Sequence, residues 1–341
     1  MNILVDGPAR SGKLLLGKLL LGSPQFKFQH FSGDIETLLE AIYFNRTNTT
    51  VEPILLELFR NNLVHTLEDL RQFRQLSINP NDSSWYKNSV FFNEFSEQIQ
   101  HGNITGLMGE NPQFIFHSHE CVLFLDSIST NKQLSKYFKS NLGTIVSIIR
   151  NPASQALSWI SRGYPKTWSR SNCHESPSIL YPPSYILPSL LRSDIEGVPW
   201  FINDSLGYYV NNGSLDVSCI ESFTVEELLV LSVCYLTYLY LESASHSLPR
   251  TNEAFLLNRF HLYHEDLHDK RAKSVELILN KMGMDYCSKT FHGLVDMETD
   301  SVRFGRKSVQ SSLDRLAVLF ANSPVLPIME NASADYLAKL N

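Results

Sequence analysis

Apolar residues along this chain form short, β-branched runs that alternate with longer stretches of helical spacing. The clearest run is residues 143–149 (GTIVSII), which is apolar at almost every position and predicts a strand buried on both faces of a parallel sheet. Elsewhere apolar positions recur every three or four residues, as at Leu55, Phe59 and Leu63, which predicts helices. Three further runs predict strands at residues 2–5, 112–119 and 255–263. This alternation predicts an α/β fold with three α/β/α layers around a central parallel sheet.

Local signals mark where some of the predicted helices begin. Thr224 and Glu227 have the spacing of a capping box, in which each side chain caps the backbone N–H of the other residue. That helix continues through the apolar run at residues 228–241, which suits a buried helix and is short of a membrane span. Pro152 suits the first turn of another helix. Further helices are predicted at residues 13–21, on either side of the polar break at 45–50, and at 153–162, 273–282 and 309–320.

Composition and charge narrow the class of protein. The chain has 341 residues, of which 43% are hydrophobic and 19% charged, and this predicts one folded domain over residues 1–341. A net charge of −6 favours neither nucleic acid nor an anionic membrane as a partner. The five cysteines are odd in number and far apart, which predicts reduced thiols. Because no apolar leader precedes the first strand, we expect a cytoplasmic protein.

One long segment lacks any regular pattern. Residues 163–213 are rich in Pro, Ser, Tyr and Trp and show no sustained spacing of apolar positions. Long insertions of this kind are commonly lids or binding loops, so we expect this segment to cover the site of an acceptor molecule. Its aromatic side chains suit a sugar and a phenol equally, and the segment is also compatible with contacts between subunits of an oligomer.

The loop between the first strand and the first helix is the strongest candidate for chemistry. Residues 7–13 (GPARSGK) match the Walker A pattern, in which backbone N–H groups and a helix N-terminus hold a phosphate. Leu14 stands where that pattern has the Ser or Thr that binds Mg²⁺ in nucleoside triphosphatases. The loop therefore predicts an anion site, and leaves open which phosphate compound it binds and which reaction follows.

Polar residues also follow the other predicted strands, at the edge where ligands bind in open α/β sheets. Arg150 ends the clearest strand and can meet a phosphate through two N–H groups, and Ser158 follows two helical turns later. His117 and His119 share one face of their strand, and a neutral imidazole at its end can accept a proton. Glu120 is a second candidate for that base. The pattern marks no third ligand that would make the two histidines a metal site.

Two charged segments late in the chain allow more than one interpretation. Glu265 and Asp266 could be a metal-binding pair in a triphosphatase. An acidic turn after a strand more commonly fixes the loop by accepting hydrogen bonds from backbone N–H groups. Arg303, Arg306 and Lys307 form a basic loop that suits either a solvated surface or a cover over a phosphate.

In this order, these segments resemble the sulfotransferases that use 3′-phosphoadenosine 5′-phosphosulfate (PAPS). Residues 5–16 are similar to the 5′-phosphosulfate loop of that family, and residues 116–119 (FHSH) to the strand that ends in its general base. Residues 149–159 (IRNPASQALSW) resemble its 3′-phosphate motif in the spacing of Arg, Pro and Ser. Residues 263–267 and 301–307 are similar to its acidic turn and to the loop that closes over the 3′-phosphate. The resemblance covers nearly the whole chain.

The resemblance implies a role for each segment. His119 would be the general base that takes the proton of an acceptor hydroxyl during in-line transfer, and Arg10 and Lys13 would neutralise charge on the groups in transfer. The implied acceptor is a hydroxyl of a small molecule or a carbohydrate, and no metal ion is required. The residues implied in binding PAPS are Pro8, Ala9, Arg10, Ser11, Gly12, Lys13, Leu14, Arg150, Ser158, Arg306 and Lys307.

The chain also departs from the pattern of that family. Lys13 and Leu14 replace hydroxyl residues of the loop, Leu15 stands where some members have a Trp against the adenine, and His117 replaces a Lys. Two alternatives therefore stay open. One is a P-loop kinase or nucleoside triphosphatase, which the pair Gly12-Lys13 favours, and the other is a nucleotide-binding protein without catalytic activity on the same fold.

Overall fold

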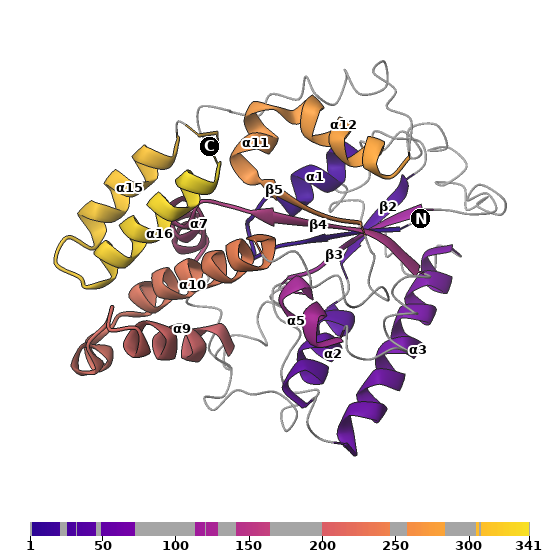
Figure 1. Ribbon diagram of the computed structural model, residues 1–341, viewed down its shortest axis with the longest axis horizontal. Coiled ribbons are helices and arrows are strands. Elements are labelled where there is room, and N and C mark those ends of the chain that lie inside the picture. The colour runs from indigo at the N-terminus through magenta and orange to yellow at the C-terminus, as the bar shows by residue number, and fades with distance from the viewer. Residues whose placement is uncertain are drawn as a thin grey trace.

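Within the residues that it describes, the computed structural model (Figure 1) contains one sheet of five strands, in which every pairing is parallel. It describes residues 2–20, 26–31, 33–45, 49–71, 113–119, 121–128, 141–163, 200–245, 258–283, 305–306 and 308–340. The strands lie in the order β2 (Phe26–Phe31), β3 (Gln113–His117), β1 (Asn2–Asp6), β4 (Leu142–Ile149) and β5 (Asn258–Tyr263). Helices lie on both sides of this sheet, so the predicted three-layer α/β/α fold is confirmed.

Strand β1 lies in the middle of the sheet. Its Val5 is level with His117 of β3 on one side and with Val146 of β4 on the other. The chain fills one side of β1 with β2 and β3 and then crosses to the other side for β4 and β5. Ligands of open α/β sheets bind outside the carboxyl ends of the strands at such a change of direction. The loop after β1 and the residues after β3 and β4 therefore meet at one edge of the sheet.

Alternate residues of the strands enter two separate cores, because successive side chains of a strand point to opposite faces. Ile3 and Val5 of β1 pack in one core, and Leu4 between them packs in the other. The first core is covered by three helices that Figure 1 shows together above the sheet, α1 (Lys13–Leu20), α11 (His264–Asp269) and α12 (Arg271–Lys281).

The remaining helices pack around the second core. The capping box predicted at the start of α10 is confirmed: the Thr224 N–H donates to Glu227 Oε2 at 2.7 Å, and the Glu227 N–H donates to Thr224 Oγ1 at 3.2 Å. The helices on this side are α2 (Gly33–Asn45), α3 (Val51–Arg71), α5 (Cys121–Ile128), α7 (Pro152–Ser161), α9 (Trp200–Asn211), α10 (Val225–Ser245), α15 (Ser308–Leu319) and α16 (Val325–Leu340).

Helix α9 corrects one expectation from the sequence. It lies within residues 163–213, where no regular structure was expected, and its Trp200 and Phe201 are buried in the second core. The prediction of an irregular insertion is therefore wrong for residues 200–211, because these residues form a helix that packs against α10. Residues 164–199 lie outside the described part of the chain, and a lid there stays a prediction.

Helix α10 is central to the second core. Among the described residues, it is the one helix long and apolar enough to cross a membrane by length and composition. It packs against α7, α9 and α16, and Leu229, Val230 and Leu231 are completely buried. A helix that is apolar on most of its surface is typical of the centre of a large core.

Candidate functional site

The loop after β1 has a backbone that only glycine allows at two positions. Gly7 and Gly12 have φ angles of 144° and 104°. A Cβ atom at Gly7 would lie 2.5 Å from the carbonyl oxygen of Ile148 in β4, and one at Gly12 would lie 2.4 Å from Nδ1 of His264. Arg10 also has a positive φ, at 64°. The loop is thus folded tightly between β4 and the residue that follows β5.

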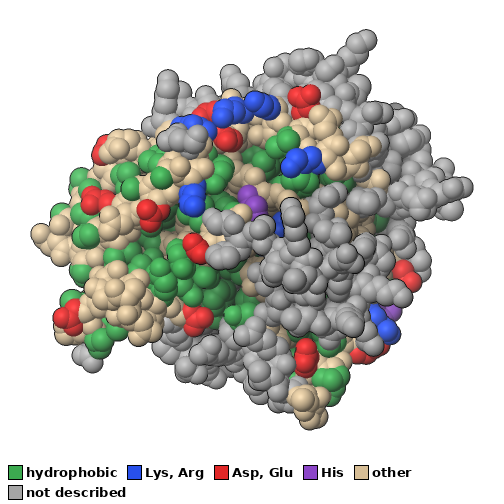
Figure 2. Space-filling view, viewed as in Figure 1, with side chains coloured by type: hydrophobic (Ala, Val, Ile, Leu, Met, Phe, Trp, Pro, Cys, Tyr) green, Lys and Arg blue, Asp and Glu red, His purple; other side chains and the backbone are tan. Residues whose placement is uncertain are grey.

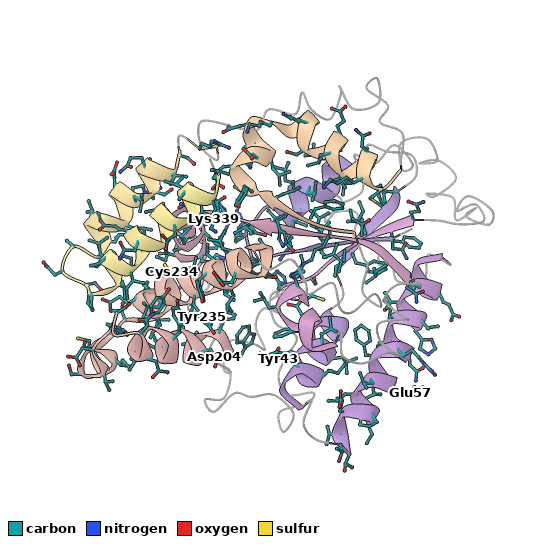
Figure 3. The ribbon with its side chains drawn as sticks, in the orientation of Figure 1. Tyr43, Glu57, Asp204, Cys234, Tyr235 and Lys339 are labelled. Carbon is teal, nitrogen blue, oxygen red and sulfur yellow. The ribbon has the colours of Figure 1, made fainter. Side chains whose placement is uncertain are left out.

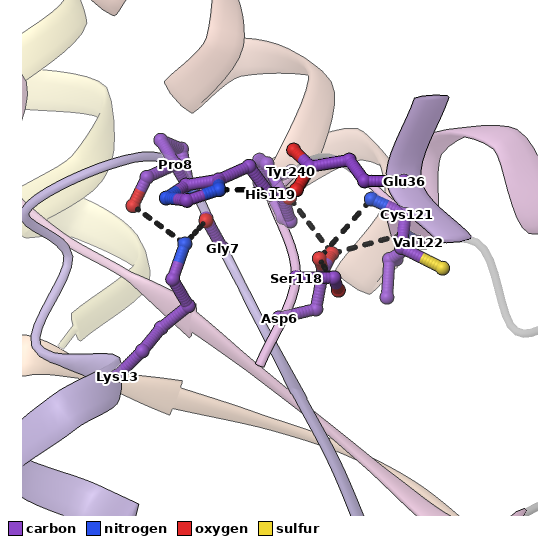
Figure 4. A network of polar contacts seen from close by, with 10 residues as sticks. All are labelled: Asp6, Gly7, Pro8, Lys13, Glu36, Ser118, His119, Cys121, Val122 and Tyr240. Carbon is purple, nitrogen blue, oxygen red and sulfur yellow. Dashed lines mark hydrogen bonds and ion pairs between the residues drawn. The ribbon is translucent and has the colours of Figure 1, made fainter. Parts of the chain in front are cut away.

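Lys13 lies inside this loop. Its buried ammonium group donates to the backbone carbonyl oxygens of Gly7 and Pro8, the latter at 3.3 Å (Figure 4). Leu14, at the position of the Mg²⁺-binding hydroxyl in the Walker A pattern, keeps 39% of its surface exposed. The loop therefore carries a positive charge within it and no hydroxyl at the following position.

Two predicted anion ligands from distant parts of the chain meet at the loop. The Nε atom of Arg10 donates to Ser158 Oγ at 3.3 Å, and Nη1 of Arg150 donates to the Arg10 carbonyl oxygen at 2.9 Å. Arg150 is buried, and this burial lowers its pKa to about 10, with Glu265 opposing the shift. The structure thus brings together three of the residues that the sequence predicted as one site.

Helix α7 holds the loop in place. The Gln155 Nε2 and Trp159 Nε1 atoms both donate to the carbonyl oxygen of Ala9, at 3.0 and 2.7 Å. Asn151 caps the start of the helix by accepting from the N–H groups of Ala153 and Ser154. The carbonyl of Ala9 is therefore occupied by α7, which fixes the side of the loop next to Ser158.

The acidic turn after β5 has a structural role. Oε1 of Glu265 accepts from the Asn151 N–H at 3.3 Å, and Oε2 accepts from the hydroxyl of Tyr336 in α16. Of the two interpretations offered by the sequence, the one that fixes a loop through a backbone N–H is confirmed for Glu265. Asp266 pairs with Arg306, whose Nη2 atom lies 2.8 Å from Asp266 Oδ1.

Arg306 thereby has structural partners that the sequence did not predict. Its Nη2 atom also donates to the Leu340 carbonyl oxygen at 3.3 Å, so the guanidinium group joins the turn after β5 to the end of α16. Its Nε atom is buried and makes no hydrogen bond within the described structure, so contact of Arg306 with a phosphate stays a prediction. Lys307, predicted beside it, and Glu120, the second candidate base, lie outside the described residues.

His119 follows β3 and contacts a residue that the sequence did not single out. Its Nδ1 atom lies 3.3 Å from Oε2 of Glu36 in the first turns of α2, and both side chains are buried (Figure 4). Burial lowers the pKa of His119 and raises that of Glu36, and the nearby charge of Lys13 lowers both. A buried imidazole at this edge of the sheet is therefore neutral near pH 7.

Asp6, the last residue of β1, organises the start of α5. Its carboxylate accepts from Ser118 Oγ at 2.5 Å, from the N–H groups of Cys121 and Val122 at 3.1 and 2.9 Å, and from the Tyr240 hydroxyl at 2.8 Å. This carboxylate caps a helix N-terminus and does not point to a ligand. Within the described segments, no three His, Cys, Asp or Glu side chains are grouped so that they could hold a metal ion.

His264, the first residue after β5, completes the site and was not predicted to belong to it. Its Nδ1 atom lies 2.8 Å from the carbonyl oxygen of Ser11, so it donates a hydrogen bond to the loop. The opposite end of the Ser11–Gly12 peptide, the Gly12 N–H, consequently points away from His264. The only sequence signal was its position directly after a strand.

An aromatic surface lies on α9 and α10. Tyr208 stacks against Tyr235 and Tyr238, with ring centroids 5.3 and 4.8 Å apart. Figure 2 shows hydrophobic side chains gathered over these helices, and Figure 3 shows Tyr235 and Asp204 close to Tyr43 of α2.

Comparison with known proteins gives few matches. No protein-family model and no curated protein matches the chain. Among solved structures, it is similar to the sulfotransferase domain from the curacin biosynthetic pathway, with 11% sequence identity, a TM-score of 0.40, and coverage of 98% of this chain and 96% of that chain. A TM-score this low supports no inference about activity, which has to be inferred from the side chains of the site.

Proposed function

We propose that this chain is a sulfotransferase that transfers the sulfonate group of PAPS to a hydroxyl of a small molecule or carbohydrate. The observation that carries the proposal is the meeting of Arg10, Arg150 and Ser158 beside the loop. PAPS has a phosphate on both the 3′ and the 5′ position of its ribose, so a protein needs two neighbouring anion sites to bind it. The loop with Arg10, Lys13 and the N-terminus of α1 provides the site for the 5′-phosphate, and Arg150 with Ser158 provides the site for the 3′-phosphate.

Buried donors support a ligand with phosphate oxygens. Within the described structure, Ser11 Oγ and Arg150 Nε are buried and make no hydrogen bond. Each such group costs about 1–3 kcal/mol when it is left unsatisfied, so buried donors of this kind favour a ligand that accepts from them. The glycines at positions 7 and 12 let the loop pack directly against β4 and His264, where a Cβ atom would clash. These residues therefore fit the phosphate groups of PAPS.

The chain supplies charge and proton acceptance to the reaction. When bound, PAPS supplies a sulfonate group whose bond to the 5′-phosphate oxygen breaks as the acceptor oxygen bonds to sulfur. Arg10, Lys13 and the loop N–H groups stabilise the negative charge left on that phosphate oxygen. His119 is neutral near pH 7 and takes the proton of the acceptor hydroxyl. The aromatic surface of α9 and α10 suits the ring of a sugar or a phenol.

A P-loop kinase or nucleoside triphosphatase is the alternative that Lys13 favours. A lysine at this position meets the β- and γ-phosphates in that class. Two features of this chain favour PAPS instead. Leu14 offers no hydroxyl to a metal ion, and the two strands beside β1 are followed by His119 and Arg150, which suit proton acceptance and a second phosphate.

Ligand-dependent thermal unfolding separates these alternatives. We expect adenosine 3′,5′-bisphosphate to stabilise the protein by about 2.7 kcal/mol at 100 times its Kd, and ATP with Mg²⁺ to stabilise it less at equal concentration. Ser158→Ala should weaken binding of the bisphosphate about tenfold, because a hydrogen bond to a charged group is lost. Ser161→Ala is the matched control, since the exposed Ser161 hydroxyl bonds only within α7, to the Ser158 carbonyl at 3.0 Å.

Two results would contradict the proposal. Stabilisation by ATP with Mg²⁺ alone would favour the triphosphatase. If Ser158→Ala and Ser161→Ala changed the binding of adenosine 3′,5′-bisphosphate equally, Ser158 would not belong to a second anion site. For transfer itself, we expect His119→Ala to retain the stabilisation by the bisphosphate and to lose turnover of PAPS with phenol or glucose as the acceptor.

A further inference from the structure

The contact between His119 and Glu36 has a consequence for proton transfer. Nδ1 of His119 and Oε2 of Glu36 lie 3.3 Å apart, although the two residues are 83 positions apart in the sequence. Their side chains have relative exposures of only 10% and 7%. The Glu36 carboxylate also accepts a hydrogen bond from the backbone of His119. The pair is therefore held by two contacts at the carboxyl edge of the sheet.

One proton has to lie between the two atoms, because two lone pairs at this distance repel each other. If the proton is on Nδ1, Nε2 carries the lone pair and can accept a proton from a hydroxyl. If the proton is on Glu36, Nε2 carries the hydrogen and cannot. The tautomer of a histidine is set by the hydrogen bond of its other nitrogen, so Glu36 decides whether His119 is a base.

Of the two charges that act on both groups, that of Lys13 has the larger effect and favours the first arrangement, and that of Asp6 opposes it. The Lys13 ammonium group stabilises an ionised Glu36 and disfavours a protonated His119, and both effects give a carboxylate beside a neutral imidazole. Burial acts against the ionised carboxylate, so this arrangement gains population as the pH rises. The titratable and charged groups that face the pair are Lys13 on α1, Asp6 on β1, Glu40 on α2, Cys121 on α5 and, through Asp6, Tyr240 on α10.

We propose that Glu36 is a positioning residue for His119, which accepts the Nδ1–H of the imidazole and so leaves Nε2 as the atom that takes the proton of the acceptor. Only one part of this assignment rests on the proposed function, namely that the proton comes from an acceptor hydroxyl. The tautomer itself is a property of the protein without any ligand, and it can be measured separately.

The test is a long-range ¹H–¹⁵N correlation spectrum of the protein labelled with ¹⁵N-histidine, recorded from pH 6 to pH 9. His119→Asn identifies the signals of His119. We expect Nδ1 to carry the hydrogen in the wild type toward the upper end of this range, and Glu36→Leu to shift His119 to the Nε2–H tautomer. Glu276→Leu, which changes an exposed carboxylate on α12, is the control and should leave the tautomer unchanged.

An Nε2–H tautomer in the wild type at every pH would overturn the assignment, and so would an unchanged tautomer in Glu36→Leu. The wild-type spectrum decides the question even if Glu36→Leu does not fold. Stabilisation by adenosine 3′,5′-bisphosphate is measured on the same samples. Its absence in the wild type contradicts the proposed function and leaves the tautomer result valid, whereas its presence with the wrong tautomer contradicts only the role of Glu36.

Discussion

The conformation of the loop after β1 predicts a large loss of stability for Gly7→Ala. The backbone at Gly7 has a φ of 144°, and the new Cβ would lie 2.5 Å from the Ile148 carbonyl oxygen and 2.7 Å from Ser11 Oγ. The carbonyl belongs to β4, whose residues Val146 and Ser147 pair with the end of β1. Moving it would disturb the pairing of these two strands, so the clash cannot be relieved by a side-chain rotation.

The magnitude follows from two contributions. An alanine at a positive φ costs about 1–2 kcal/mol, and forcing a methyl group into a packed site adds about 1–3 kcal/mol. Gly213→Ala supplies the control, because Gly213 also has a positive φ of 76° but has nothing within 4 Å of its Cβ position. We expect a loss of about 2–5 kcal/mol at Gly7 and of about 1–2 kcal/mol at Gly213.

Urea unfolding followed by circular dichroism measures both values, provided that the slope m is the same in the variants and the wild type. We also expect Gly7→Ala to lose the stabilisation by adenosine 3′,5′-bisphosphate, since the loop would have to shift. If the two variants differed by less than about 1 kcal/mol, the loop would not be packed against β4 as described, and the reasoning from its geometry would be refuted.

Three further predictions concern neighbouring residues. Asp6→Ala should lower the free energy of unfolding by about 3–5 kcal/mol in urea, because four donors lose their acceptor; a loss below about 1 kcal/mol would contradict the network. The combined effect of Gly12→Ala and His264→Ala should be smaller than the sum of the single effects by about 1 kcal/mol or more, since removing the imidazole makes room for the new Cβ; additive effects would contradict this contact. Burial, and then the charge of Glu36, raise the pKa of Glu40 from 4.5 to about 8, so the stability contributed by its neutral form is present below pH 4.5 and is lost as the pH rises to 8. Between pH 5 and pH 8.5 we expect the free energy of unfolding to fall by about 1–3 kcal/mol more in the wild type than in Glu40→Gln, a range that allows for the partial contact of Glu40 with solvent. Glu276→Gln, which changes an exposed residue, is the control and should show the same fall as the wild type.

Most of the sheet was predictable because a buried parallel strand needs only a continuous apolar run. That signal is local and marks β1, β3, β4 and β5. Strand β2 (FKFQHF) mixes apolar with polar and charged residues, as an edge strand does, and was missed. Helix α16 was missed for a different reason: Pro327 lies in its first turn, where proline is tolerated although it usually indicates a break.

The candidate site was predictable to the extent that its residues follow strands. The loop, Arg150 and His119 could be placed at one edge of the sheet without knowing the order of the strands. Contacts between elements far apart in sequence could not be predicted in this way. The bond from His264 to Ser11 joins residues 253 positions apart, and it depends on β5 lying beside β4 and on the path of the loop.

The order of the strands also separates the two kinds of chemistry at this site. On the side of β1 where β3 lies, His119 and Glu36 form a buried pair that can hold or accept a proton. On the side where β4 lies, Arg150 and Arg10 bring positive charge to the loop. Lys13 lies between the two groups, bound to carbonyls of the loop after β1, and its charge affects the pKa of the acid–base pair. In the proposed function a lysine at this position would serve both sides: it would neutralise an anion held by the loop, and its charge adds to burial in lowering the pKa of the imidazole beside it. This dual role gives a physical reason for a lysine followed by a leucine, where a metal-dependent phosphate site would need a hydroxyl.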